Sequence, residues 1–247
     1  MSGPELSDVQ QYAVRLGDDA LVLAQRLSEW AAAAPTLEDD VALLNIALDL
    51  LGQARSLLSL AGDEDELAML RDERAFTNCQ LVEQPIGDFG VTMARQLLFA
   101  AWALPLWQGL CSSTDAGLAG IAGKAVKEVA YHLDHARTWV VRLGAGTDES
   151  HSRMQAGLDL VWPYAAELFE RDDLVDRLAV IGMVPDPAVL QALWHTTVAE
   201  VLAEATLTEP ITTWAPTGGR RGLHTDGFGL LLAELQHVAR SHPGATW

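Results

Sequence analysis

Acidic, amide and imidazole side chains recur at helical spacing inside otherwise apolar segments of this 247-residue chain. They are Glu29, then Asn45, Asp49 and Gln53 at steps of four, and then Lys124, Glu128 and His132, also at steps of four. Four long helices can hold a di-metal site when two of them supply a lone Glu and the other two supply Glu-x-x-His, which places carboxylate and imidazole one turn apart on the inner face. The first chemistry to test against this sequence is therefore the binding of two iron ions.

The sequence does not complete that ligand set. Where Glu-x-x-His is required, one polar line reads Asp49-x-x-Gly52 and the other reads Glu128-x-x-Tyr131. His132 follows Glu128 by four residues rather than three, and no acidic residue lies between positions 88 and 115. Because too few anionic ligands remain for two iron ions, we expect no catalytic residue, no metal ligand and no cofactor in this chain.

A hypothesis for what replaces the ions follows from the cost of burying charge. The degenerate di-iron-like positions are Glu29, Asp49, Glu128 and His132. If the three acids point inward, they cannot stay charged and unpaired. We therefore predict a metal-free interior in which hydrogen bonds and basic side chains take the place of the ions, and exposure of the acids on the surface is the open alternative. The candidate neutralising partners are Arg26, Arg95, Lys124 and Lys127.

One complete Glu-x-x-His match occurs at Glu234-Leu235-Gln236-His237. It falls on a short predicted helix near the end of the chain, and no second pair accompanies it. A single match of this length arises often by chance in a helical protein, so we interpret it as a solvated helix face.

A glycine-rich loop at 218–222 contains Arg220 and Arg221, with His224 just beyond it. Paired arginines can bind a carboxylate or a phosphate of a ligand or partner. We predict Arg220, Arg221 and His224 as a possible partner-contact loop, and a solvated loop is the open alternative. Trp214 and Trp247 lie outside the strong apolar stripes, so we predict that they dock a partner.

Composition excludes several classes of protein. Lys and Arg number 16 and Asp and Glu number 34, which gives a net charge of −18 and argues against nucleic acid and anionic membrane surfaces as partners. Cys79 and Cys111 are isolated, so no disulfide framework is expected. The segment 97–107 is too short to span a membrane and no secretory signal is visible, which together predict a cytoplasmic protein without a membrane segment.

The elements that position these residues are helices, since no strand-like alternation is convincing. Apolar residues recur at three- and four-residue steps in two stripes: Leu16, Ala20, Leu23, Leu27, Trp30 and Ala34, then Leu37, Val41, Leu44, Leu48, Leu51 and Leu58. Thr36, Asp88, Asp115 and Asp186 are the predicted N-caps. We predict one all-α domain over residues 1–247, with a four-helix core at about 8–33, 37–61, 89–110 and 116–143 and additional helices at about 148–171, 187–206 and 226–241.

Seven blocks of the chain resemble the C-type component of ring-1,2-phenylacetyl-CoA epoxidases. They are 16–18 (Leu-Gly-Asp), 24–30, 45–55, 71–74 (Arg-Asp-Glu-Arg), 81–85 (Leu-Val-Glu-Gln-Pro), 127–132 and 222–225 (Gly-Leu-His-Thr). The blocks agree in order from about Tyr12 to Trp247, which makes the resemblance specific.

The resemblance implies a ferritin-like four-helix bundle with additional helices. It also implies a complex that inserts one oxygen atom of O₂ into the ring of phenylacetyl-CoA, with electrons from NADPH delivered by a separate reductase. In that complex the di-iron centre belongs to the A-type component, the catalytic subunit. The C-type component is then its non-catalytic structural partner in aerobic phenylacetate degradation, and it contacts the other subunits and the reductase indirectly.

Two other functions stay open. One is a self-sufficient di-iron oxygenase with Glu29, Asp49, Glu128 and His132 as an unusual ligand set, and bound iron with O₂-dependent turnover of the isolated chain would favour it. The other is a homo-oligomeric ferritin-like protein without an oxygenase partner, and failure to bind the catalytic subunit would favour that one.

Overall fold

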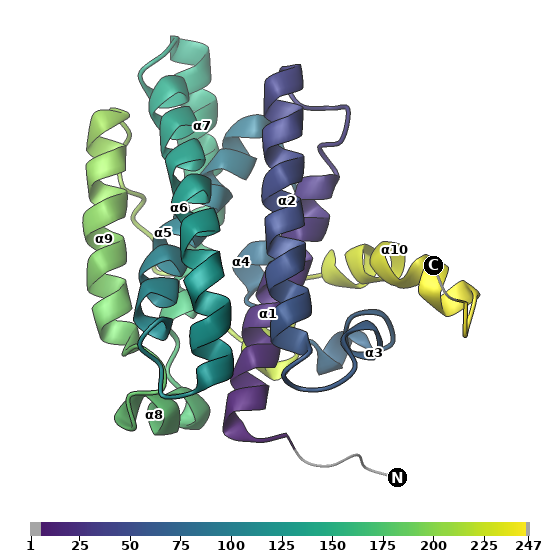
Figure 1. Ribbon diagram of the computed structural model, residues 1–247. Helices are drawn as coiled ribbons and strands as arrows, with labels where there is room; N and C mark the ends of the chain where they lie inside the picture. Colours follow the sequence, from purple (N-terminus) through teal and green to yellow (C-terminus); the bar gives the residue numbers. More distant parts are fainter. Residues whose placement is uncertain (1–5, 246–247) are drawn as a thin grey trace.

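The computed structural model describes residues 6–245, and within them every regular element is a helix (Figure 1). The α-helices are α1 (Asp8–Ser28), α2 (Leu37–Leu58), α3 (Glu64–Met69), α4 (Gln80–Glu83), α5 (Phe89–Leu110), α6 (Ala116–Gly144), α7 (Asp148–Val161), α8 (Asp173–Val180), α9 (Pro187–Glu204) and α10 (Phe228–Ser241). Short 3₁₀ helices lie at Glu73–Ala75, Trp162–Phe169 and Gly219–Arg221. The predicted all-α, ferritin-like fold is confirmed.

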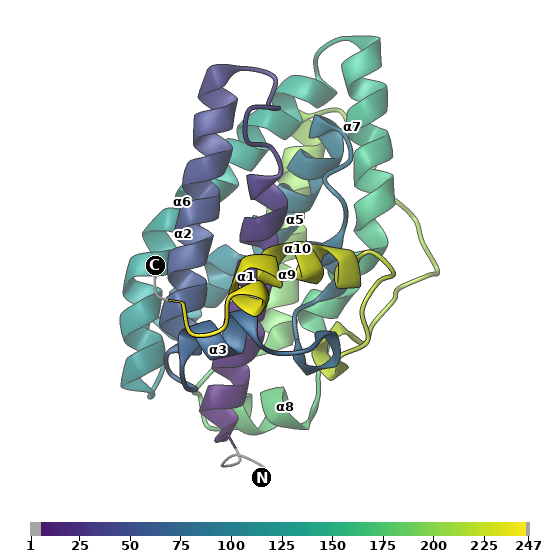
Figure 2. The same cartoon turned by 90° about the vertical axis from the view of Figure 1, so that its right-hand side faces the viewer.

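Two antiparallel helix pairs, α1 with α2 and α5 with α6, form the core of the bundle. In Figure 1 the helices α2 and α6 form the outer layer that faces the viewer, and α1 and α5 lie behind them. Helices α7 and α9 cover the other side of α5, which is why α5 is apolar on nearly every face and largely buried. Figure 2 shows α10 crossing α1 next to α3.

Side-chain caps set the starts of the long helices, as the sequence predicts. Thr36 accepts a hydrogen bond from the Asp39 backbone N–H, and Asp88 and Asp115 cap α5 and α6 in the same way. Asp186 caps α9, whose first residue is a proline. These four predicted N-caps are present.

Several predicted helix ends differ from the observed ones. Helix α1 ends at Ser28, and the following turns include Ala32 with a φ of +61°. The predicted helix at 148–171 is α-helical only to Val161 and continues as 3₁₀ turns, because Pro163 has no N–H to donate to the α-helical ladder. Helix α5 runs through Pro105 as one element.

Helix α2 has two apolar faces. Its buried residues include Leu43, Ile46, Leu50 and Leu57, on the face that packs against α1. Most of the stripe read from the sequence lies on the other, exposed face: Leu37, Val41, Leu48 and Leu51. By length and composition, α2 and α5 are apolar enough to cross a membrane, but in their most apolar 18-residue stretches 83% of the residues of α5 and 44% of those of α2 are buried within this fold. The stripe therefore identified the helix correctly but not its core face.

Candidate functional site

The two polar lines of the sequence meet between α2 and α6. His132 Nε2 lies 3.1 Å from Asp49 Oδ2, and Gln53 Nε2 donates to Glu128 Oε2 over 2.9 Å. Lys124 Nζ lies 3.3 Å from Glu128 Oε1. These five residues form a row of polar contacts across the pair of helices, here called the α2–α6 ladder.

Partial burial governs the charges of the ladder. His132 is buried, whereas the side chains of Asp49 and Glu128 are 35% and 16% exposed to solvent. Burial lowers the pKa of His132, and the hydrogen bond with Asp49 only partly opposes this. The imidazole is therefore neutral at pH 7 and acts as a hydrogen-bonding partner of Asp49 rather than as its counter-ion.

Glu29 lies apart from the ladder, at the end of α1. Its carboxylate pairs with Arg26 Nη1 at 2.8 Å. Arg26 also donates from Nε and Nη2 to the backbone oxygen of Glu83. The pair therefore ties the end of α1 to α4, with Glu29 only half-buried.

Arg95 lies fully buried on α5 and contacts none of the ladder acids. Its Nη1 donates to the backbone oxygen of Gln84, and no group of the described residues binds its Nε or Nη2. Burial, with repulsion from Arg26, lowers the pKa of this guanidinium to about 9. Lys127 is exposed. Of the four basic residues predicted as neutralising partners, Arg26 lies within ion-pair distance of Glu29 and Lys124 within ion-pair distance of Glu128.

The donor groups do not fit a pair of iron ions. Among residues 6–245, no group of three or more His, Cys, Asp or Glu side chains is arranged to hold a metal ion. Glu29 and Glu128 each have a cationic partner, and Asp49 contacts a single imidazole. A ligand set shared by four helices needs carboxylates that converge on common ions. Glu234 and His237 are both exposed, which agrees with a solvated helix face.

A second polar network, missed by the sequence patterns, centres on Glu83. This carboxylate is fully buried and accepts hydrogen bonds from Asn78 Nδ2 at 2.9 Å and from both the N–H and the hydroxyl of Thr225 at 2.8 Å. His224 Nδ1 lies 2.5 Å from the same carboxylate. Burial opposes a charge on His224, but the hydrogen bond and charge of Glu83 outweigh it and raise the pKa of the imidazole.

Two more buried acids extend this network. Asp19 accepts from the Cys79 N–H at 2.7 Å and pairs with Arg220 at 2.8 Å. Glu167 accepts three backbone hydrogen bonds, from Gln80 at 2.6 Å and from residues 218 and 219 at 2.7 Å each. A glycine at 218 is required because its φ of +129° turns these N–H groups inward. We call Glu83, Asp19, Glu167 and their partners the core network.

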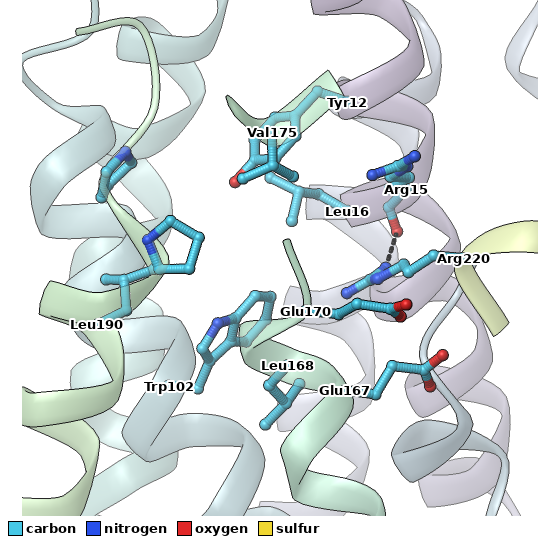
Figure 3. A pocket seen from close by; sticks show the side chains of 12 residues that line it. Tyr12, Arg15, Leu16, Trp102, Glu167, Leu168, Glu170, Val175, Leu190 and Arg220 are labelled. Atoms are coloured by element: carbon cyan, nitrogen blue, oxygen red, sulfur yellow. Dashed lines mark hydrogen bonds between the residues drawn. The ribbon is translucent and has the colours of Figure 1, made fainter. Parts of the chain in front are cut away.

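A small cavity lies beside the core network (Figure 3). Tyr12, Trp102, Glu167 and Arg220 contribute to its wall, and its volume is about 40 Å³. A water molecule needs roughly 10–15 Å³ by this measure, so the cavity holds a few waters at most. It is far too small for a coenzyme A ester.

The loop predicted to contact a partner makes most of its side-chain contacts inside this chain. Arg220 and His224 are held in the core network, whereas Arg221 is half exposed and pairs with Glu170. Trp214 is 57% exposed and stacks edge-on with Tyr164. Trp247 lies outside the described residues. Partner contact by this loop stays a prediction; of the residues predicted to make it within 6–245, Arg221 and Trp214 are exposed enough to take part.

The fold is a ferritin-like helical bundle, and the ladder places paired polar side chains between α2 and α6. A family model described as "Phenylacetic acid catabolic protein" matches residues 3–247, so this chain belongs to that family. It is 48% identical, over 98% of its length and 100% of the relative's, to the Escherichia coli (strain K12) protein named as the C subunit of 1,2-phenylacetyl-CoA epoxidase. The resemblance predicted from the sequence is confirmed.

Proposed function

We propose that this chain is the non-catalytic structural subunit of a phenylacetyl-CoA epoxidase in aerobic phenylacetate degradation. Identity of 48% over the full length of the Escherichia coli relative is the observation that carries the proposal. The chain pairs with the di-iron catalytic subunit in the cytoplasm and, through it, serves the other subunits and the reductase.

The polar contacts of the bundle support the absence of a catalytic centre in this chain. Glu128 accepts a hydrogen bond from Gln53 and pairs with Lys124, and Glu29 pairs with Arg26. A carboxylate held by a cation binds a metal only after that ion pair breaks. The NADPH- and O₂-dependent chemistry therefore takes place in the catalytic partner, and this chain supplies a rigid bundle that supports it.

The two alternative functions make different predictions, one about iron binding and one about binding to the catalytic subunit. A self-sufficient di-iron oxygenase would bind iron through Glu29, Asp49, Glu128 and His132, yet Glu29 lies outside the ladder that joins the other three. A homo-oligomer without an oxygenase partner would not bind the catalytic subunit.

Co-expression with the catalytic subunit from the same genome tests the proposal. We expect the tagged catalytic subunit to capture this chain and epoxidation to require both. Glu128→Gln should leave epoxidation within about twofold, because a glutamine fills the same space and the acid takes no part in the reaction. A large drop in the chemical step of an assembled complex would contradict the structural role.

A further inference from the structure

The exposed face of α2 carries aliphatic residues in a strict order. Leu37, Val41, Leu44, Leu48 and Leu51 follow one another at steps of four, three, four and three. Four of them are 75%, 51%, 65% and 37% exposed, in the order Leu37, Val41, Leu48 and Leu51. Leu44 is half-buried. We call these five residues the α2 seam.

No other element of the described chain covers the seam. In Figure 1, α2 and α6 form the front layer of the bundle, and in Figure 2 the same two helices form its left edge. Single exposed leucines are normal on a protein surface. A continuous apolar line over four turns of one exposed helix is unusual, and exposed apolar patches of this kind mark contact sites.

The spacing of the seam specifies the shape of what covers it. A 4-3-4-3 repeat is narrower than the apolar stripe of a helix that faces a globular core. It is the pattern of a helix that packs lengthwise against one other helix at a shallow crossing angle of about 20°. The matching surface is therefore a long helix with its own aliphatic line.

A cleft between α2 and α6 lies at the C-terminal end of the seam. Its volume is about 200 Å³, and small residues, among them Gly52, Ser56 and Gly120, line much of it. Lys124 and Glu128 of the ladder supply its polar wall. The cleft can therefore receive side chains of a helix that lies along the seam.

We propose that the α2 seam, with this cleft, is the surface that docks a long amphipathic helix of the catalytic subunit. The inference rests on the proposed function, which requires a second chain of the same complex. The N-terminal end of the seam is flanked by Glu38 and Asp40. The docked helix accordingly carries Lys or Arg at that end.

A second copy of this chain fits the seam less well. Each copy has a net charge of −18, so association of two copies brings strong like charges together. A lipid surface also fits poorly, because the acidic residues Glu38 and Asp40 flank the N-terminal end of the seam and an anionic membrane repels them. The opposite face of α2 is buried against α1.

Substitution of Leu48 tests the seam without disturbing the core. Leu48→Arg and the control Leu230→Arg change equally exposed leucines, at 65% and 68%, but Leu230 lies on α10, away from the seam. Both variants should fold with unchanged helicity by circular dichroism. Each is co-expressed with the tagged catalytic subunit, and its dissociation constant is measured with the purified proteins.

We expect Leu48→Arg to weaken binding to the catalytic subunit by about tenfold or more, and Leu230→Arg and Leu48→Met to change it less than about threefold. If Leu48→Arg binds the catalytic subunit as tightly as the wild type does, the α2 seam is not the docking surface, and the proposed function is unaffected. Complete failure of the wild-type chain to bind the catalytic subunit overturns both.

Two further results would assign the seam to another occupant and overturn the inference. The first is concentration-dependent dimerisation of the isolated chain in sedimentation experiments that Leu48→Arg abolishes. The second is flotation of the isolated chain with phosphatidylglycerol vesicles that Leu48→Arg abolishes.

Discussion

The α2–α6 ladder and the core network hold acidic side chains in opposite ways. In the ladder each acid has one or two side-chain partners and keeps some exposure to solvent. In the core network Glu83 and Glu167 are buried, and each accepts at least three hydrogen bonds, of which one comes from the backbone at Glu83 and three at Glu167. The positions that resemble a metal site are thus loosely held, and the rigid polar centre of the molecule lies where α1, α4 and the 218–225 loop meet.

The largest effect expected from this comparison is on stability, at Glu83. Glu83→Gln removes the negative charge that faces His224 and turns an amide toward the donors of Asn78 and Thr225. Breaking a buried ion pair from one side costs about 3–5 kcal/mol. Urea unfolding followed by circular dichroism measures this loss, and a loss below about 1 kcal/mol would mean that the core network does not stabilise the fold.

A smaller loss is expected at Glu167, whose hydrogen bonds come from the backbone N–H groups of Gln80 and the glycine loop. Glu167→Gln keeps one acceptor oxygen and places an amide against a buried N–H, which costs about 1–3 kcal/mol. Hydrogen exchange should accelerate at residues 218 and 219 more than elsewhere. Uniform exchange across the chain would contradict a local role.

The two networks also predict opposite pH dependences. The pKa of His224 is raised, so its stabilising effect is full below the unfolded value of about 6.5 and is lost as pH rises through the folded pKa. The pKa of His132 is lowered, so its contribution is present above about 6.5 and is lost as pH falls through the folded pKa.

Substituting each histidine with glutamine separates these two effects. His224→Gln should cost more stability at pH 6 than at pH 8, whereas His132→Gln should cost more at pH 8 than at pH 5. Urea unfolding at each pH provides the measurement. Parallel pH profiles for the two variants would show that the networks do not differ in the way described.

The smallest effect is expected at Glu128. Gln53 can still hydrogen-bond a glutamine at this position and the exposed Lys124 can turn to solvent, so Glu128→Gln should change the free energy of unfolding by less than about 1 kcal/mol. A loss as large as that of Glu83→Gln would remove the distinction between the ladder and the core network.

The features that the sequence predicted correctly depend on neighbouring residues. Apolar periodicity and the caps at Thr36, Asp88 and Asp115 located the long helices, because both signals act within one or two turns. The buried face of α2 could not be predicted, since both of its faces are apolar and only the packing against α1 decides which one is covered.

The core network was missed because its contacts join distant parts of the chain. Glu83 contacts His224 and Thr225, which follow it in the sequence by 141 and 142 residues. Asp19 pairs with Arg220, which follows it by 201 residues. The signal present in the sequence was weak, a single acid that follows two apolar residues, Leu81 and Val82. Such an acid, when buried, requires partners, although its sequence neighbours do not reveal them.

Iron content tests the central claim, that this chain supports the epoxidase without binding its metal. The triple variant Asp49→Asn, Glu128→Gln, His132→Gln removes every candidate ligand of the ladder, and element analysis of the complex that it forms with the catalytic subunit gives iron per complex. We predict the same iron content as in the wild-type complex and no tightly bound iron in the isolated chain. Loss of iron from an assembled variant complex would contradict the claim.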